Sequence, residues 1–503
     1  MKLLDLGLIH PFMFGLLPIL ILYVNNIAEI SIESLLLPIT IIYATTVVLL
    51  IVISKIIKNL QKSTLIVSFF LLIFFTIGYV QLELRGNEIF GFRADSLTVI
   101  GIPYIIFLLI GLYAIYKKTE MTKPNQIISV ISIAVILSFL PTAISDSSGF
   151  LTNEFYEKIE FNVNEKPDVY LILLDGYAGE RSLENNFRFD NSFFLDSLGD
   201  SNFYVSKNNF SNYQWSNLAM SSLLNMNYLD NYPDYSVDDY FLLRDLYNHN
   251  LVMKTFQDNG YNTYFIDGGS PFREIQVSTE TLCHTTDNGI LQNLIDTSMI
   301  STLSKRFSTI SWTEIRTCAF EELENIPNKS NEPKFTYAHI NLPHHPYNYD
   351  DNGNLIEYSE RIEELTEEES NHRYINQLKV TNEKVLELVQ KIISSSENTP
   401  IIIITSDHGW GLEAHHCKEP CETDKRFLIQ RYNNFQAVYP SNNIEFYDEL
   451  TSVNLFRQIL NDNFGTELEL LENKAIFVKK DSITSDYISQ IEITDIVKPK
   501  KGR

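Results

Sequence analysis

Five long apolar stretches in the first 145 residues constrain the fold more than any other feature of this chain. Each stretch is about 18 to 23 residues long and carries almost no charge. A helix of that length crosses roughly 30 Å of hydrocarbon, and it satisfies its own backbone hydrogen bonds in lipid. We therefore predict a transmembrane helical domain over residues 1–145, with spans at Leu6–Val24, Leu35–Ile57, Leu65–Leu82, Leu97–Tyr116 and Ile127–Ile144.

The charges of the connecting segments predict how this domain is oriented. On one side the connectors carry only two basic residues, Arg85 and Arg93. By the positive-inside rule, the other, lysine-rich side faces the cytoplasm, together with the N-terminus. An odd number of spans then places everything after Ile144 outside, which predicts a multi-pass protein of the cell membrane with an extracytoplasmic domain. The lysines of the inner side are Lys2, Lys55, Lys58, Lys62, Lys117, Lys118 and Lys123.

The rest of the chain is strongly acidic. The net charge of the protein is −24. Because the first 145 residues contribute +2, the remainder carries −26. An acidic body excludes nucleic acid as a partner, since a phosphate backbone requires clustered Lys and Arg. No GxxxxGK[ST] or GxGxxG motif is present, so a bound nucleotide is not indicated. We divide this part into a linker (146–166), a folded domain (167–480) and a tail (481–503).

Short apolar runs predict the strands of the folded domain. Asp168–Leu174, Pro333–Asn341 and Ile401–Ile404 are rich in β-branched, aromatic and other apolar residues. Runs of this kind are typical of strands that are buried on both faces, as in a parallel sheet. The amphipathic segment Thr381–Ile393 precedes the last run and suits a crossover helix. The pattern predicts an α/β domain, with a mainly parallel sheet between layers of helices.

Two of these strands end in residues suited to a metal. Asp175 and Gly176 follow the first strand, and Asp407, His408 and Gly409 follow the last. Open α/β sheets bind ligands at the carboxyl ends of their strands, and glycine lets the backbone turn sharply there. Carboxylate and imidazole together suit Mn²⁺, Mg²⁺ or Zn²⁺. Either ending alone is equally typical of a surface turn, whereas the pair predicts a shared site for one divalent cation, or two.

A serine at a predicted helix start is the candidate nucleophile. The segment 209–225 opens polar and becomes helical after Ser216. One interpretation is that Ser216 caps this helix. The other is that its hydroxyl, at the positive end of the helix dipole and beside a cation, attacks a substrate. The local sequence leaves both open.

Four motifs in order resemble the sulfatase-like branch of the alkaline phosphatase superfamily. They are ILLDGYAGE, SNYQWSNLAMSSLLNMNYL, HINLPHHPY and TSDHGWG, and the resemblance covers roughly Pro167 to Phe477. The architecture is similar to that of membrane-anchored lipoteichoic acid synthases and phosphoethanolamine transferases. The resemblance implies a sulfatase-like fold for residues 167–480. It also implies that Asp175, Ser216, Asp407 and His408 bind the metal, that Ser216 is the nucleophile, and that His344 and His415 contact the transferred group.

The chain also departs from these relatives. Many of them have Glu at the first metal ligand and Thr at the nucleophile, where this chain has Asp175 and Ser216. True sulfatases need the C/S-x-P-x-R motif that is converted to formylglycine, and Ser216 is followed by neither Pro nor Arg at those positions. Sulfate-ester hydrolysis by the formylglycine route is therefore not expected. His339, on the strand, is expected to be a packed or hydrogen-bonded core residue.

All four cysteines lie in the acidic part. Cys417 and Cys421 predict a local disulfide, with zinc binding together with His415 and His416 as the alternative. Cys283 and Cys318 are expected to pair likewise, in an oxidising compartment.

Three functions are compatible with these features. The first is a metal-dependent phosphotransferase at the outer face of the membrane. It would move a head group from a lipid donor, through phosphoserine at Ser216, to a glycan or lipid acceptor. The second is a hydrolase or phosphodiesterase that uses water as the acceptor. The third is a non-catalytic envelope scaffold.

Overall fold

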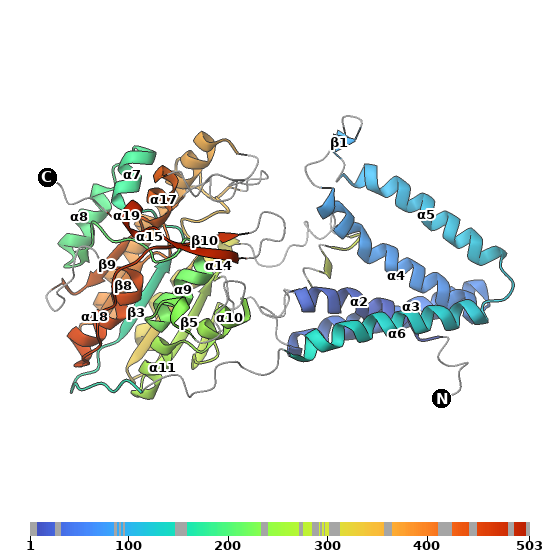
Figure 1. Ribbon diagram of the computed structural model, residues 1–503, viewed down its shortest axis with the longest axis horizontal. Coiled ribbons are helices and arrows are strands. Elements are labelled where there is room, and N and C mark those ends of the chain that lie inside the picture. The colour runs from blue at the N-terminus through green and yellow to red at the C-terminus, as the bar shows by residue number, and fades with distance from the viewer. Residues whose placement is uncertain are drawn as a thin grey trace. The chain divides into compact units, whose positions relative to one another are not determined.

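The computed structural model places the chain in two compact units (Figure 1). One comprises residues 1–149 and 285–309, and the other comprises 150–284 and 310–503. The structure describes residues 8–25, 32–84, 88–89, 92–93, 96–145, 158–232, 240–270, 275–283, 291, 294–295, 297–300, 312–356, 365–410, 425–441, 450–480 and 487–498. Each unit is described below by itself.

The first unit is a bundle of apolar helices. Four of them, α3 to α6, are long and apolar enough to cross a membrane. The first helix, α2, has 16 residues and a length of about 24 Å, which is short for a bilayer core. Five helices thus lie where five spans were predicted, and in the described part of the chain four of them have spanning length. Their bounds are α2 His10–Asn25, α3 Leu36–Ile57, α4 Leu60–Glu83, α5 Leu97–Lys117 and α6 Thr122–Ser145, with a 3₁₀ turn η1 at Ile32–Leu35 and a two-residue hairpin of β1 (Glu88–Ile89) and β2 (Phe92–Arg93).

Part of the segment 285–309 belongs to this bundle, although the residues that flank it in sequence belong to the other unit. Leu294 is buried in the apolar core formed by α2, α3 and α4. The backbone N–H of Gly78 in α4 donates to the carbonyl of Thr297 at 3.1 Å, and the N–H of Met299 donates to the carbonyl of Phe74 at 2.9 Å. A Cβ at Gly78 would lie 2.3 Å from the Thr297 carbonyl oxygen, so this approach requires glycine.

The second unit is built on a seven-stranded sheet. The strand order is β4-β9-β8-β3-β7-β5-β6, and the five strands from β8 to β6 run parallel, while β9 and β4 form an antiparallel edge. The predicted strands are confirmed as β3, β7 and β8, which are neighbours in the centre of the sheet. The bounds are β3 Val169–Leu174, β4 Tyr204–Val205, β5 Asn262–Gly268, β6 Glu280–Leu282, β7 Lys334–Ile340, β8 Ile401–Thr405 and β9 Gln436–Tyr439.

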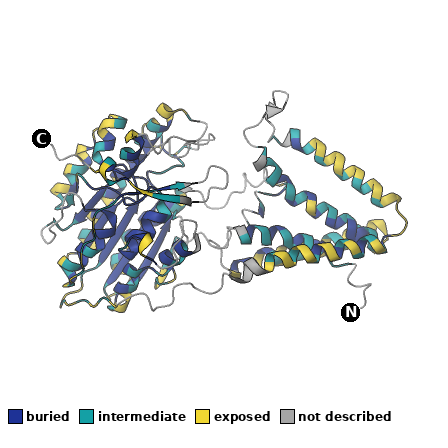
Figure 2. Cartoon of the chain, in the orientation of Figure 1, coloured by how far each residue is buried: buried dark blue, intermediate teal, exposed yellow. Residues whose placement is uncertain are grey.

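Helices cover both faces of this sheet, as Figure 1 shows. Alternate residues of β3 enter two separate apolar cores, because successive side chains of a strand point to opposite faces. One core contains helices α9, α10, α11 and α18, and the other contains α7, α8, α14 and α15. The inner strands β9, β8, β3, β7 and β5 are largely buried (Figure 2). The bounds are α7 Glu180–Phe187, α8 Ser192–Asp200, α9 Ser216–Asn225, η3 Leu229–Asn231, α10 Tyr240–Asn248, α11 Leu251–Asp258, α14 Trp312–Asn325, η4 Ile326–Asn328, α15 Glu367–Ser395, α17 Lys425–Tyr432 and α18 Ser452–Phe464.

The ends of two elements differ from the sequence-based expectation. The crossover helix α15 begins well before Thr381, because Thr366 and Glu369 form a capping box that starts it early. The fold also continues past residue 480, since β10 (Ile476–Lys480) pairs antiparallel with β11 (Tyr487–Glu492) and α19 (Thr494–Val497) follows.

A disulfide joins Cys283, just after β6, to Cys318 in α14, with the two Cα atoms 5.8 Å apart. The expected pairing of these two cysteines is thereby confirmed. Cys417 and Cys421 lie outside the described residues.

Candidate active site

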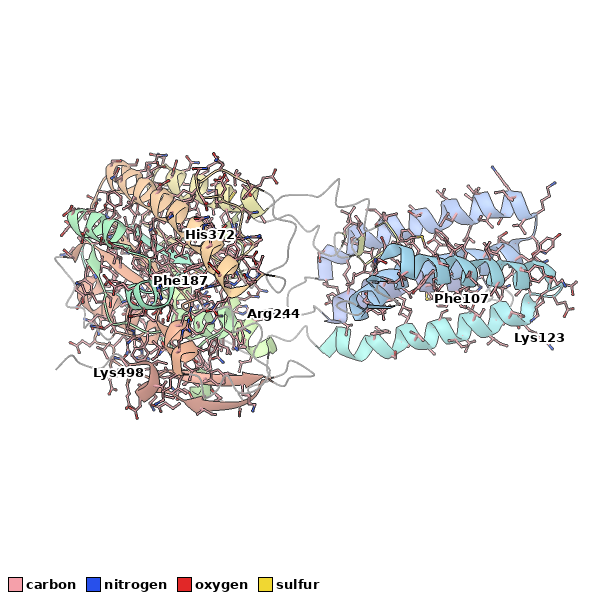
Figure 3. All side chains as sticks on the ribbon, turned by 90° about the horizontal axis from the view of Figure 1, so that it is seen from above. Phe107, Lys123, Phe187, Arg244, His372 and Lys498 are labelled. Carbon is pink, nitrogen blue, oxygen red and sulfur yellow. A yellow bond between two sulfur atoms is a disulfide. The ribbon has the colours of Figure 1, made fainter. Side chains whose placement is uncertain are left out.

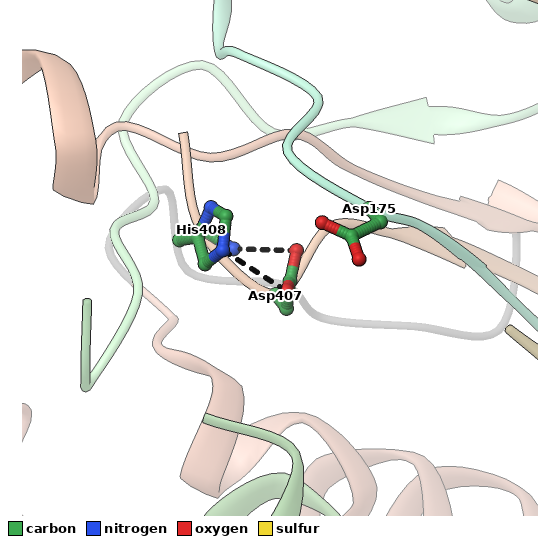
Figure 4. Close-up of side chains that lie close together, drawn as sticks. All are labelled: Asp175, Asp407 and His408. Atoms are coloured by element: carbon green, nitrogen blue, oxygen red, sulfur yellow. Dashed lines mark hydrogen bonds and ion pairs between the residues drawn. The ribbon is translucent and has the colours of Figure 1, made fainter. Parts of the chain in front are cut away.

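The two predicted carboxylates lie side by side at the carboxyl edge of the sheet (Figure 4). Asp175 follows β3 directly, and Asp407 follows β8 by two residues. Since β3 and β8 are adjacent and parallel, their ends bring together residues 232 positions apart in sequence. The turn after β3 places Gly176 at a φ of +68°, and its N–H donates to Asp407 Oδ1 at 3.0 Å. The turn that follows Asp175 therefore also binds the carboxylate of Asp407, which keeps the two carboxylates close together.

His408 completes a buried group of three. Ligand atoms of Asp175, Asp407 and His408 all lie within 4.8 Å of one another. The Nδ1–H of His408 donates to the carbonyl of Gly409 at 2.8 Å, which leaves Nε2 as the atom with a lone pair. That Nε2 faces Asp407 Oδ2 at 3.2 Å. A Cβ at Gly409 would lie 2.3 Å from the carbonyl oxygen of Gln430, so glycine is required beside this histidine.

Ser216, at the start of α9, lies next to this group of three residues. The N-cap residue of α9 is Trp215, so Ser216 is the first residue inside the helix and is not its cap. Its Oγ lies 3.1 Å from His408 Nε2. The structure therefore favours the second interpretation of Ser216, in which its hydroxyl faces the carboxylate and imidazole cluster.

Burial and neighbouring charges shift the pKa values of the cluster in different directions. Burial works against ionisation of Asp175, but the charges of His344 and His339 outweigh it and hold the pKa of Asp175 well below its usual range. Burial and the charge of Asp175 raise the pKa of Asp407 to about 6. Burial, reinforced by Arg431, lowers the pKa of His408 to about 3. The imidazole is therefore neutral near pH 7, which is the form that binds metals.

The residues present fit a divalent cation. Asp175 Oδ1 and Asp407 Oδ2 are buried, and neither accepts a hydrogen bond within the described part of the chain. Unpaired buried carboxylate oxygens are costly, and a cation beside them removes that cost. Two carboxylates, one imidazole and a hydroxyl form a donor set that suits Mn²⁺, Mg²⁺ or Zn²⁺ without choosing among them.

His339, in β7, and His344, in the loop that follows β7, border the cluster. His339, fully buried as expected, places Nε2 3.3 Å from Asp175 Oδ2, while its Nδ1 lies 3.0 Å from the hydroxyl of Tyr337. The backbone N–H of His344 donates to the carbonyl of Asp175 at 3.2 Å. His344 remains half-buried, so its side chain is accessible beside the cluster.

Two side chains that sequence reasoning missed hold the His344 loop. The guanidinium of Arg316, in α14, donates to the carbonyls of His344 and Pro346, both at 3.0 Å. The amide of Gln377, in α15, donates to the same His344 carbonyl at 2.6 Å. Both side chains are buried. These hydrogen bonds hold the backbone of the His344 loop in place.

Arg431, in α17, is a third residue that sequence reasoning missed. Its Nε donates to the carbonyl of Gln214 at 2.8 Å, and one of its terminal nitrogens donates to His408 Nε2 at 2.9 Å. The guanidinium also lies over the ring of Trp215, 5.3 Å from its centre. Arg431 thus links the residues just before Ser216 to the imidazole. A signal exists in the sequence, because Arg431 lies three and four positions after the apolar Leu428 and Phe427, on the buried face of α17.

The remaining predicted site residue, His415, lies outside the described residues, as does His416. The structure therefore brings together Asp175, Ser216, Asp407 and His408, and it places His344 next to them.

The family model named Sulfatase matches residues 167–457, which is more than half of the chain. The chain belongs to the sulfatase family. It is accordingly a sulfatase-like enzyme, as the ordered motifs predict, and the matched residues include the whole described cluster. No curated protein matches the chain significantly.

Three solved bacterial structures are among those to which the chain is similar. The integral membrane protein lipooligosaccharide phosphoethanolamine transferase A from Neisseria meningitidis has 12% identity and a TM-score of 0.40, covering 91% of this chain and 94% of its own. The C-terminal periplasmic domain of EcEptC from Escherichia coli, in a complex with zinc, has 14% identity and a TM-score of 0.40, covering 61% and 87%. The C-terminal periplasmic domain of the phosphoethanolamine transferase EptC from Campylobacter jejuni has 12% identity and a TM-score of 0.41, covering 63% and 95%.

Proposed function

We propose that this protein is a metal-dependent phosphotransferase at the outer face of the membrane, and that Ser216 is its nucleophile. The observation that carries the proposal is the position of the Ser216 hydroxyl, 3.1 Å from His408 Nε2, beside two buried carboxylates with oxygens that accept no hydrogen bond in the described structure. Asp175, Ser216, Asp407 and His408 would hold one divalent cation. When bound, the cation lowers the pKa of the serine hydroxyl and neutralises phosphoryl oxygens.

The chain's own residues then perform a two-step displacement. Ser216 Oγ forms a bond to the phosphorus of a lipid head group, while the bond from phosphorus to the glycerol oxygen of the donor breaks and diacylglycerol leaves with a proton. The hydroxyl of a glycan or lipid acceptor next attacks the phosphoserine, and Ser216 regains its proton. In this proposal His344 donates a hydrogen bond to a phosphoryl oxygen, and the family resemblance implies the same role for His415.

Three features support an outer, membrane-tethered site. The basic connectors of the bundle predict that the segment after α6 lies outside. The Cys283–Cys318 disulfide is typical of an oxidising compartment. A catalytic domain on the same chain as membrane helices meets a lipid donor at high effective concentration. The departure from C/S-x-P-x-R argues for an unmodified serine hydroxyl and against the formylglycine route.

Phosphoenzyme labelling tests the proposal. The full-length protein, in detergent with Mn²⁺, Mg²⁺ or Zn²⁺, is incubated with phospholipids carrying a labelled phosphate and quenched in acid. We expect labelled protein from the wild type and none from Ser216→Ala, with partial labelling in Ser216→Thr. The matched control is Ser192→Ala, because Ser192 is also the first residue of a helix but is exposed. Undiminished labelling of Ser216→Ala would reject the assignment.

Product analysis separates transfer from hydrolysis. If water is the acceptor, the labelled head group appears free in solution whether or not a glycan is added. If the enzyme is a transferase, a glycan or lipid acceptor takes the label and free head group falls.

A further inference from the structure

The helical bundle contains an open apolar groove, and the residues that line it are distant in the sequence from the carboxylate cluster. It encloses about 440 Å³ between α4 and α5. Leu65, Ser68, Phe69 and Leu72 of α4 line it at the spacing of one helical face, as do Gly111, Ala114 and Ile115 of α5. Lys118, which directly follows α5, continues this spacing, and residues of α2 and α6 complete the lining. From residue 111 to residue 118 the groove runs along about 10 Å of helix.

Helix α5 is separated from the rest of the bundle on one side. It packs on α4, and it diverges from α6 beyond the turn that joins them (Figure 1). Most of its large apolar side chains are exposed, as Figure 2 shows in yellow, and Phe107 is labelled among them in Figure 3. A lipid bilayer has no water to fill such a gap, so acyl chains must cover whatever protein does not.

The deep part of the groove has no free polar group. Ser68 is the one polar residue along α4 in the lining, and its hydroxyl lies 2.5 Å from Nδ1 of His10. The other ring nitrogen of His10 lies 2.7 Å from the amide oxygen of Asn125. These buried polar groups form hydrogen bonds with one another, so a molecule in the groove contacts mainly apolar side chains. The volume of the groove is within the range of small-molecule sites.

The mouth of the groove is basic. Lys118 lines it, and Lys117 and Lys123 flank it at the turn between α5 and α6, where Figure 3 labels Lys123. Lys62 lies nearby, with its ammonium donating to the carbonyl of Tyr116 at 2.8 Å. Lys118 is exposed, and the turn between α5 and α6 carries one acidic residue, Glu120, against these lysines. Clustered lysines at the end of apolar helices attract anionic lipid head groups.

We propose that this groove binds one anionic phospholipid, with an acyl chain between α4 and α5 and the phosphate of the head group on Lys118. This lipid is distinct from the donor of the phosphotransfer reaction. The groove lies near Thr122, where α6 begins, whereas the linker follows the opposite end of that helix, at Ser145. The site therefore serves the packing of α5 and does not depend on the chemistry at Ser216.

Native mass spectrometry of the full-length protein tests this inference. Delipidated protein in detergent is titrated with phosphatidylglycerol and with phosphatidylcholine of the same acyl chains. We expect one phosphatidylglycerol per chain, bound about fivefold or more tightly than phosphatidylcholine. Lys118→Glu should bring phosphatidylglycerol down to the level of phosphatidylcholine, and Ala114→Phe, which fills the groove from an exposed position, should abolish binding of both.

Matched controls keep the test specific. Lys55→Glu changes the same charge at the basic end of α3 outside the groove, and Ala134→Phe enlarges an exposed alanine of α6 outside the lining. Both should bind phosphatidylglycerol as the wild type does. Equal affinity for the two lipids, unchanged binding in Lys118→Glu, or a lipid-free dimer whose mass is lost on Ala114→Phe would each overturn the proposal. The last result would mean that a second copy of the chain fills the groove. The phosphoserine labelling that tests the proposed function does not depend on lipid binding in this groove, so the two proposals can fail separately.

Discussion

Replacing Arg431 by Met tests how the serine and the imidazole are held in place. Methionine keeps much of the length of the side chain but removes every donor. The guanidinium is fully buried, and although burial lowers the pKa of Arg431 to about 10, it stays charged at neutral pH. The variant leaves the carbonyl of Gln214 without its donor and removes the contact over the ring of Trp215.

The expected cost follows from these contacts. A buried hydrogen bond from a charged donor is worth about 1.5–3 kcal/mol, so the loss of the contact to Gln214, which a cation on His408 leaves in place, should destabilise the α/β unit by about 2 kcal/mol. Because Gln214 and Trp215 directly precede the nucleophile, displacement of Ser216 by about 1 Å should also lower the rate of phosphoenzyme formation roughly 100-fold.

The control is Arg457→Met, in α18. Arg457 also donates from Nε to a backbone carbonyl, that of Met226, at 2.8 Å, but it does not touch the cluster. Thermal unfolding in detergent should show a lower midpoint for both variants. Labelling at a temperature where both are folded should be slow only in Arg431→Met. Equal labelling rates in the two variants would refute the positioning role of Arg431.

Further predictions concern the cluster, the disulfide and the bundle. His344→Gln should slow labelling about 100-fold while metal content stays constant, because a phosphoryl contact is lost and no ligand is. Because the pKa of Asp407 is raised to about 6, a cation must displace its proton below that pH, so metal affinity measured by titration should fall about tenfold per pH unit there and level off above pH 6. Cys283→Ser opens a loop of 35 residues and should cost about 3–4 kcal/mol in thermal or chemical unfolding; no loss would show that the disulfide is not structural. Gly78→Val should lower the unfolding midpoint of the protein in detergent, whereas Gly101→Val, which meets nothing within 4 Å, should not.

The meeting of Asp175 and Asp407 could be predicted, because the local sequence indicates the strands and the topology of a parallel sheet then indicates where their ends lie. Asp175 and Asp407 each follow an apolar run that is typical of a buried strand. Once both strands are parallel and central, their carboxyl ends meet at one edge. Ser216 was harder to assign, since a serine at a helix start is as typical of a cap as of a nucleophile. Only the backbone angles of Trp215 and the contact with His408 separate the two interpretations.

The three buried side chains that hold the site in place could not be predicted from the sequence, and the reasons are physical. Arg316, Gln377 and Arg431 are polar residues on amphipathic helices, where such residues are usually solvated. Their burial depends on partners more than 20 positions away in sequence, such as the carbonyls of Gln214 and His344. Strand β5 was missed as well. The packing of Leu294, Thr297 and Met299 on the helical bundle was also missed, because a short apolar stretch does not show in the sequence which unit it packs against.

Metal stoichiometry tests the central claim most directly. The full-length protein is purified with Mn²⁺, Mg²⁺ or Zn²⁺, desalted, and analysed by mass spectrometry of the elements, alongside Asp407→Asn. We predict one tightly held divalent ion per wild-type chain and almost none in the variant, with both proteins folded. A wild-type protein without a divalent ion, or a variant that keeps a full equivalent, would contradict the account.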